Sequence, residues 1–263
     1  MRIEALRRPT LFDALGEFRV PLEATMFWLQ ALTYPWPRVS PSDSKVVMLI
    51  PGFMAGDVTL LPMANFCRWL GHTAVFGGIW SNSKCPRLTL DQLGTRLAEV
   101  SRKYHAPVVV IGQSLGGVYA RQLARRFPDR VDQVISLGSP INNPRAAANL
   151  AVQAVARTIA SIRGRAEGCL SESCACGLSL GDGKPDHVPA TVVFSRSDGI
   201  VHWQSCIDRS GSPLVENVEV MCSHVGMGLN VDVYRIIAER LARPAGSDRR
   251  LTRDRTEAAA RAN

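Results

Sequence analysis

The sequence passes from a strand into a helix through Pro107-Val108-Val109-Val110-Ile111-Gly112-Gln113-Ser114-Leu115-Gly116-Gly117. Residues 107–111 are an apolar, β-branched run of strand length, and residues 116–127 have the apolar spacing of a helix. The pattern G-x-S-x-G between them is typical of a serine held on a strained turn at the carboxyl edge of a sheet. A Cβ at Gly112 or Gly116 would collide with the neighbouring strand and helix, so both positions require glycine. The alternative, a Gly-rich turn with an incidental serine, has to be weighed against the rest of the chain.

Strands and helices alternate on both sides of this turn. The expected strands are residues 45–50, 73–76, 107–111, 132–137, 190–195 and 217–222, and the expected helices are 57–70, 89–104, 116–127 and 227–242. Continuous apolar strands that alternate with amphipathic helices are typical of a mostly parallel sheet with helices on both faces. The predicted fold class is therefore α/β.

The length of 263 residues suits one enzyme-sized core with additions. The expected regions are an N-terminal helical extension (one helical stretch around 11–32) and Pro-rich linker over 1–44, a core over 45–140 and 190–243, a cap or lid insertion over 141–189, and a charged, disordered tail over 244–263. An insertion as long as the third region is usually functional. Its helix near 145–163 carries an apolar stripe that consists of Leu150, Val152, Val155, Ile159 and Ile162. This stripe suits acyl chains, although packing against the core explains the pattern equally well.

Composition excludes several classes of protein. Hydrophobic residues make up 46% of the chain and charged residues 21%, which excludes disorder of the whole chain. The longest apolar runs are far shorter than the roughly 20 residues that span a bilayer, and the N-terminus lacks the apolar core of a secretory signal. A cytoplasmic location is therefore expected. The net charge of +8 is spread without interleaved aromatic residues, so no nucleic-acid partner is expected, while attraction to an anionic membrane surface or substrate stays open.

Three of the seven cysteines form a cluster, Cys169, Cys174 and Cys176. Such a cluster is compatible with a local disulfide or a metal site, but no histidine or second cysteine pair lies close in the sequence. The expected cytoplasmic setting favours free thiols. No metal and no cofactor are expected.

A serine hydroxyl is a poor nucleophile and needs a histidine base that is oriented by a carboxylate. In this architecture the chain order is serine, acid, histidine. The histidines are His72, His105, His187, His202 and His224. The first two precede Ser114, the third lies before the next strand, and the fourth shares a loop with the best candidate acid. His224 directly follows the strand 217–222, so its loop can reach the serine, and it is the predicted base.

The predicted acid is Asp198, in the stretch Ser195-Arg196-Ser197-Asp198-Gly199-Ile200-Val201. It lies at the carboxyl end of the strand 190–195, between the serine and the histidine in chain order. An aspartate before a glycine is also a common turn signal. Asp208 is the reserve candidate.

An acyl-transfer site also needs two backbone N–H groups for the oxyanion. One is that of Leu115, the residue after the serine. The other is expected from the loop Pro51-Gly52-Phe53-Met54-Ala55-Gly56, with Phe53 as the first candidate and Met54 as the second.

Taken together, Gly52-Phe53, the Gly112–Gly116 turn, Asp198 and His224 resemble the α/β-hydrolase superfamily in its lipase/esterase-like branch, over residues 45–242. The stretches 195–201 and 223–227 also resemble a group of bacterial α/β hydrolases whose natural substrates are mostly unassigned. Many lipases have His-Gly where this chain has Pro51-Gly52, and the usual antiparallel strands before residue 45 are missing.

The resemblance implies a metal-independent serine esterase or lipase that acts on a small-molecule or lipid ester. Ser114 is the nucleophile of the acyl-enzyme, His224 the base and Asp198 its partner. An acyltransferase or thioesterase with the same triad is one alternative, and a non-catalytic protein that binds a hydrophobic ligand is another. The oligomeric state does not follow from the sequence.

Overall fold

In the computed structural model, the described part of the chain comprises residues 16–33, 36, 40, 43–142 and 187–244. The predicted cap over 141–189 and tail over 244–263 lie almost entirely outside these residues. The cysteine cluster at 169–176 and the apolar stripe near 145–163 lie outside them as well.

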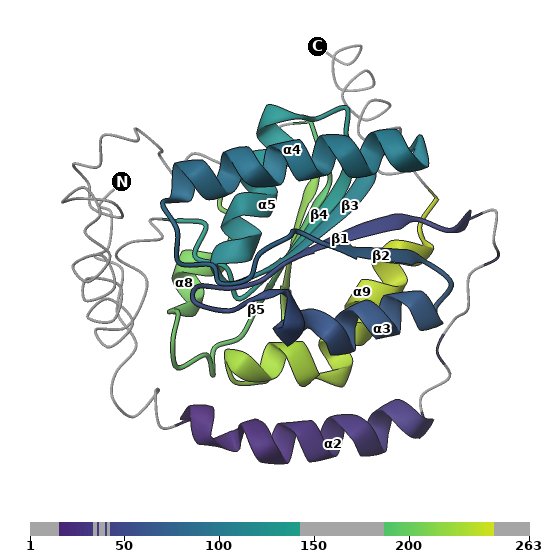
Figure 1. Ribbon diagram of the computed structural model, residues 1–263. Helices are drawn as coiled ribbons and strands as arrows, with labels where there is room; N and C mark the ends of the chain where they lie inside the picture. Colours follow the sequence, from purple (N-terminus) through teal and green to yellow (C-terminus); the bar gives the residue numbers. More distant parts are fainter. Residues whose placement is uncertain (1–15, 34–35, 37–39, 41–42, 143–186, 245–263) are drawn as a thin grey trace, which may run out of the picture.

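A single sheet of six strands forms the centre of the molecule, in the order β2-β1-β3-β4-β5-β6 (Figure 1). Every neighbouring pair is parallel. The strands are β1 (Val46–Ile50), β2 (Thr73–Phe76), β3 (Val108–Gln113), β4 (Val131–Leu137), β5 (Ala190–Phe194) and β6 (Val215–Glu219). The predicted α/β class with a parallel sheet is confirmed.

Helices cover both faces of the sheet, because the central strands are apolar on both sides. In β1, Val47 and Leu49 pack on one face, while Val46, Met48 and Ile50 pack on the other. The first face is covered by α3 (Leu61–Trp69) and α9 (Val231–Ala242), and the second by α4 (Pro86–Tyr104) and α5 (Leu115–Arg126) (Figure 1). None of the helices in the described ranges combines the length and the apolar character needed to cross a bilayer.

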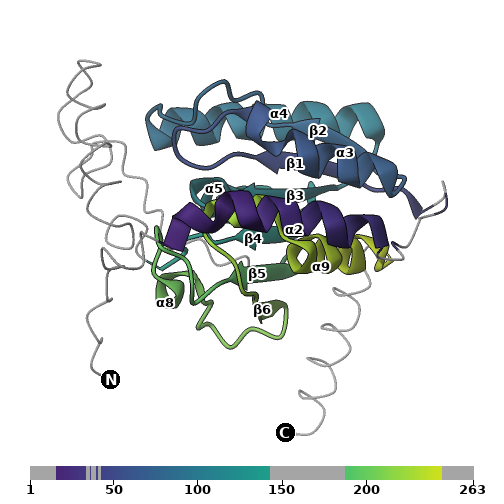
Figure 2. The same ribbon diagram turned by 90° about the horizontal axis from the view of Figure 1, so that it is seen from below.

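The N-terminal extension adds a further layer outside α3 and α9. It consists of η1 (Gly16–Arg19) and α2 (Val20–Thr33), and Figure 2 shows α2 alongside α9. The Phe27 ring lies against that of Tyr234 with the ring centres 4.7 Å apart. This packing brings the first turns of the extension next to η4 (Val225–Leu229). The described part of the predicted stretch 11–32 is thus helical, and no strand precedes β1 in the described residues.

Some predicted elements have different bounds. The predicted helix 57–70 is divided into η3 (Asp57–Leu60) and α3, because Pro62 has no N–H to continue the helical hydrogen bonds. The predicted helix 227–242 is divided into η4 and α9, because the Asn230 side chain caps α9 by accepting from the N–H groups of Asp232 and Val233.

The last strand was also misplaced by the sequence pattern. It occupies Val215–Glu219 instead of 217–222, and most of its side chains are partly or fully exposed. As an edge strand it tolerates polar residues, so its sequence lacks the apolar run of a central strand. The apolar residues 220–222 instead form the start of the loop that leads to His224.

Candidate active site

Ser114 occupies the turn between β3 and α5. Its φ of 52° and ψ of −122° lie in a region that non-glycine residues rarely adopt, at a cost of about 1–3 kcal/mol. Two backbone hydrogen bonds hold the turn: the Ser114 N–H donates to the Leu137 carbonyl at 2.8 Å, and the Gly117 N–H donates to the Ser114 carbonyl at 3.0 Å. The serine is therefore fixed at the carboxyl edge of the sheet, at the N-terminus of a helix.

The glycines around Ser114 allow the close approach of three backbone segments. A Cβ at Gly112 would lie 2.3 Å from the carbonyl carbon of Gly116, and a Cβ at Gly116 would lie 2.2 Å from the carbonyl oxygen of Ile50. Real Cβ atoms do not come this close to backbone atoms. Both positions therefore require glycine, and β1, β3 and α5 meet directly beneath the serine.

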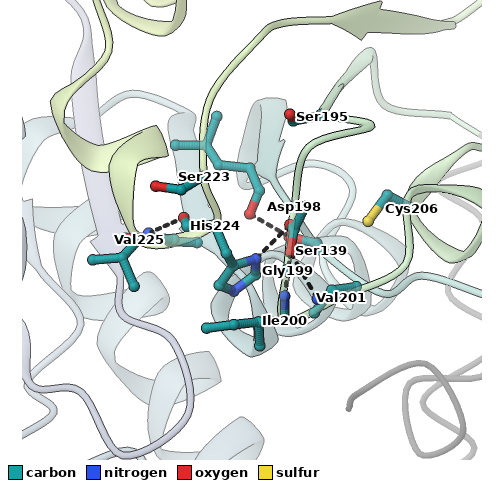
Figure 3. A network of polar contacts seen from close by, with 12 residues as sticks. Ser139, Ser195, Asp198, Gly199, Ile200, Val201, Cys206, Ser223, His224 and Val225 are labelled. Carbon is teal, nitrogen blue, oxygen red and sulfur yellow. Dashed lines mark hydrogen bonds and ion pairs between the residues drawn. The ribbon is translucent and has the colours of Figure 1, made fainter. Parts of the chain in front are cut away.

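His224 and Asp198 form a buried pair at the same edge of the sheet (Figure 3). The distance from His224 Nδ1 to Asp198 Oδ2 is 2.5 Å, and the two residues are 6% and 5% exposed. The other oxygen, Asp198 Oδ1, accepts from the N–H groups of Ile200 at 2.9 Å and Val201 at 2.7 Å. With both carboxylate oxygens engaged, the Asp198 side chain is held in one orientation and fixes Nδ1 of the imidazole.

The charges around His224 favour its protonated form. Burial alone would lower the pKa of the imidazole, but the Asp198 carboxylate, its hydrogen bond and the charge of Glu17 outweigh burial and raise the pKa above its ordinary value. An imidazolium formed during a reaction would be stabilised by these groups.

Two contacts connect the serine turn with the Asp198–His224 pair. The Gln113 side chain donates from Nε2 to the His224 carbonyl at 3.4 Å. Gly138 follows Leu137, whose carbonyl accepts from the Ser114 N–H. It also lies against the pair, because a Cβ at Gly138 would be 3.1 Å from His224 Nδ1 and 3.2 Å from Asp198 Oδ2. The structure thus brings the Ser114 turn, which follows β3, next to the loops after β5 and β6 that carry Asp198 and His224.

Ser195 joins the acid loop to the base loop. Its hydroxyl donates to the Cys222 carbonyl at 2.7 Å, and it accepts from the Cys222 N–H at 3.3 Å and the Ser197 N–H at 3.1 Å. The hydrogen bonds of Ser195 therefore hold the loop that carries Asp198 against the loop that carries His224.

The loop after β1 lies against the serine. A Cβ at Gly52 would be 3.2 Å from Ser114 Cβ. Asn82 holds this loop, since its Nδ2 donates to the Pro51 carbonyl at 2.8 Å and its backbone carbonyl accepts from the Met54 N–H at 2.9 Å. The N–H of Met54, the second candidate oxyanion donor, is therefore engaged by the Asn82 carbonyl.

The N–H groups of Phe53 and Leu115, the first candidates, make no hydrogen bond with any other described residue. The Pro51 that replaces the usual histidine contributes only its carbonyl to the anchoring of the loop.

Asp208, the reserve acid, has a different role. It forms a buried ion pair with Arg121 of α5 and accepts from the Ser210 N–H at 2.7 Å. Although burial raises its pKa, the hydrogen bonds from Ser210 and the charge of Arg121 lower the pKa below its ordinary value. It therefore remains a charged structural group.

The other histidines of the described chain serve local structure or lie at the surface. Nδ1 of His72 accepts from the Lys45 N–H at 3.1 Å, and His105 ends α4 in the left-handed conformation. His202 directly precedes α8 (Trp203–Cys206), and His187 is exposed. No cluster of histidine, cysteine, aspartate and glutamate suited to a metal ion occurs within the described ranges.

Two buried cysteines lie close to the pair, Cys206 and Cys222. Burial raises the pKa of both thiols, and the negative charge of Asp198 raises each further. A thiolate is therefore strongly disfavoured at both positions, so neither cysteine is a candidate nucleophile.

Sequence reasoning missed several residues that hold the site. Gln113 and Ser195 lie within the motifs that it quoted, and their polar side chains next to the serine and the acid were a usable signal. Gly138 follows a strand, which marks it as a turn residue. Asn82 and Glu17 lie far from any motif, and only the folded chain places them.

Comparison with known proteins agrees with this architecture. The family model described as alpha/beta hydrolase fold matches residues 102–175, which include the Ser114 turn. A search of curated protein sequences found no match.

Solved structures share the fold at low sequence identity. Lipase B of Aspergillus fumigatus superimposes with a TM-score of 0.57 at 16% identity, over 78% of this chain and 54% of that chain, so this chain spans only about half of that lipase. A Bacillus licheniformis lipase in its mature form gives 0.56 at 14% identity, over 79% of this chain and 96% of that one. The monoacylglycerol lipase of Paleococcus ferrophilus gives 0.53 at 14% identity, over 74% and 93%. From the parallel sheet, the family match and these superpositions together, the chain is a protein of the α/β-hydrolase fold.

Proposed function

We propose that this protein is a serine hydrolase that cleaves carboxylic esters through an acyl-enzyme on Ser114. The observation that carries the proposal is the buried contact of 2.5 Å between His224 and Asp198 beside a serine with a φ of 52°. A serine in a strained backbone conformation, next to an oriented imidazole, has the arrangement of an activated nucleophile.

In the first half of the reaction, Ser114 Oγ attacks the ester carbonyl carbon and its proton passes to Nε2 of His224. Asp198 holds Nδ1 and stabilises the imidazolium. The N–H groups of Leu115 and Phe53 are the proposed donors to the oxyanion, aided by the N-terminus of α5. The bond to the alcohol oxygen then breaks, and the alcohol leaves with the proton from Nε2.

In the second half, water attacks the acyl-enzyme. His224 Nε2 takes one proton from the water and returns it to Ser114 Oγ as the carboxylic acid leaves. The overall reaction is ester plus water to acid plus alcohol, with no net change in the enzyme.

Exposed apolar groups on and next to the loop after β1 support a substrate with an apolar acyl chain. Trp80 is 97% exposed and Met54 is 49% exposed. Both lie by the loop after β1, where a Cβ at Gly56 would be 2.2 Å from the Trp80 carbonyl oxygen. The three solved structures that share the fold are named as lipases, one of them as a monoacylglycerol lipase, which agrees with this substrate class.

The proposal is tested by turnover of p-nitrophenyl esters of increasing acyl length, with water and with added alcohol. We expect hydrolysis that Ser114→Ala abolishes without changing the melting temperature. Transfer to the alcohol in preference to water would assign an acyltransferase instead, and an inactive wild-type protein that still binds fatty esters would assign a binding protein.

A further inference from the structure

The N-terminal extension contacts the loops of the candidate active site, and the role inferred for this contact rests on the proposed function. Glu17 of η1 lies more than 180 residues from Asp198 and more than 200 from His224 in sequence. Its carboxylate nevertheless reaches both of their loops. The extension precedes the first strand of the sheet, so the core of the fold alone does not supply this group.

Glu17 accepts three backbone hydrogen bonds. Its Oε1 accepts from the Gly199 N–H at 3.0 Å and the His224 N–H at 2.8 Å, and its Oε2 accepts from the Val225 N–H at 3.1 Å. Figure 3 shows Gly199, His224 and Val225 on the two neighbouring loops that carry the acid and the base. One carboxylate therefore joins the residue after Asp198 to His224 itself.

Glu23, on the first turn of α2, binds Ser223, the residue before His224 in the base loop. It accepts from the Ser223 N–H at 2.8 Å and from the Ser223 hydroxyl. Its approach depends on Gly226, where a Cβ would lie 1.8 Å from Glu23 Oε2. The two glutamates thus engage the N–H groups of three consecutive residues, 223, 224 and 225.

These contacts do more than anchor the extension. Hydrogen bonds from a backbone N–H to a carboxylate are stronger than those between neutral groups, and they fix the position of the donor. His224 itself donates its N–H to Glu17. Gly199, the residue after Asp198, is another donor to the same carboxylate. A displacement of either loop changes the position of the imidazole relative to Ser114.

We propose that Glu17 is a positioning residue of the active site, which joins the acid loop to the base loop from the N-terminal extension, with Glu23 as its support. Glu17 does not touch the substrate or the reacting atoms. It acts through the backbone of His224 and through its charge, so this one residue of the extension contributes to the positioning of the catalytic groups.

Two charged side chains among the described residues face His224, and they determine how a substitution of Glu17 changes the pKa of the imidazole. Asp198 faces it from the acid loop, and Glu17 from η1, where its charge raises the pKa of the imidazole. Glu23 lies on the next turns, with Arg19 at 3.9 Å. Removal of the Glu17 charge lowers the pKa of His224, whereas removal of its oxygens releases the loops.

Two variants separate these effects. Glu17→Gln removes the charge but keeps an oxygen that accepts from the N–H groups of Gly199 and His224. Glu17→Ala removes both the charge and the oxygen. We expect Glu17→Ala to lower kcat about 10- to 100-fold with little change in KM, because a displaced catalytic group affects the chemical step. Glu17→Gln is expected to lower kcat less. Both variants shift the acid limb of the kcat profile to lower pH.

Matched controls show whether the effect is specific. Phe18→Ala changes an 82% exposed residue on the same turn, and Glu99→Gln removes an exposed carboxylate on α4. Both are expected to retain wild-type kcat and the wild-type pH profile. Gly226→Ala keeps both glutamates in the sequence but displaces the Glu23 carboxylate, and it is expected to lower kcat as well.

The pKa of His224, measured by NMR on histidine-labelled protein, gives a readout that does not need turnover. A lower pKa in both Glu17 variants, together with the loss of kcat in Glu17→Ala, supports the proposal. A lower melting temperature with unchanged kcat, pH profile and His224 pKa shows that Glu17 is only structural and overturns it. If the wild-type protein hydrolyses no ester, the proposed function fails, and an unchanged His224 pKa in the variants then overturns the positioning role separately.

Discussion

Nδ1 of His224 and Oδ2 of Asp198 lie 2.5 Å apart in a buried contact. The negative charges of Asp198 and Glu17 raise the pKa of the imidazole above its ordinary value of 6.5, despite burial. Because only the neutral imidazole accepts the serine proton, activity should rise as the pH passes upward through this pKa. We expect a single acid limb in the profile of kcat/KM, with a midpoint above 6.5. A midpoint well below that value would contradict the observed surroundings of His224.

The two candidate acids should respond differently to substitution. Asp198→Asn removes the carboxylate that sets the tautomer of His224, and losses of about 10⁴-fold in kcat are known for such a change. Asp208→Asn removes the negative charge beside the buried Arg121, which should lower the free energy of unfolding by about 3–5 kcal/mol while kcat of the folded enzyme changes little. Kinetics and thermal unfolding of both variants test this; the reverse pattern would move the acid to Asp208.

Asn82 should control the oxyanion loop. Asn82→Ala removes the hydrogen bond to the Pro51 carbonyl, so the Phe53 N–H loses its fixed position. We expect kcat to fall about 10- to 100-fold with a smaller change in KM. Ser81→Ala, one residue away, leaves the bonds of Asn82 intact and serves as the control. Equal kinetics for both variants would place the oxyanion donor elsewhere.

Trp80 should affect the preference for acyl length. Trp80→Ser removes an exposed ring beside the loop after β1, and we expect KM to rise more for long-chain than for short-chain esters. Leu29→Ser removes an apolar side chain of α2 that is 59% exposed, and it should leave KM unchanged for long-chain and short-chain esters. An equal effect of Trp80→Ser on all chain lengths would show that the acyl group binds elsewhere.

The sequence predicted the features that depend on local patterns. The apolar run before Gly112, the glycines around Ser114 and the order of Asp198 and His224 along the chain are all readable without a structure. Continuous apolar strands also predict a parallel sheet covered on both faces, because only such strands are buried on both sides.

Features that depend on tertiary contacts were not predictable. Glu17 is one of several charged residues in an amphipathic stretch and suggests nothing more, until folding places it against residues about 200 positions away. The edge strand β6 carries glutamates and an asparagine, so its apolar neighbours 220–222 gave a misplaced strand. Asn82 lies in a loop without a motif, and its role follows only from its contacts with Pro51 and Met54.

Mass mapping after reaction with a fluorophosphonate tests the role of Ser114 most directly, because the reagent phosphonylates an activated serine and loses fluoride. We expect one adduct, on Ser114, which forms in the Glu99→Gln control, is lost in Ser114→Ala and forms much more slowly in a His224→Ala variant. A folded wild-type protein that remains unlabelled, or that is labelled at another serine, would contradict the assignment of Ser114 as the nucleophile.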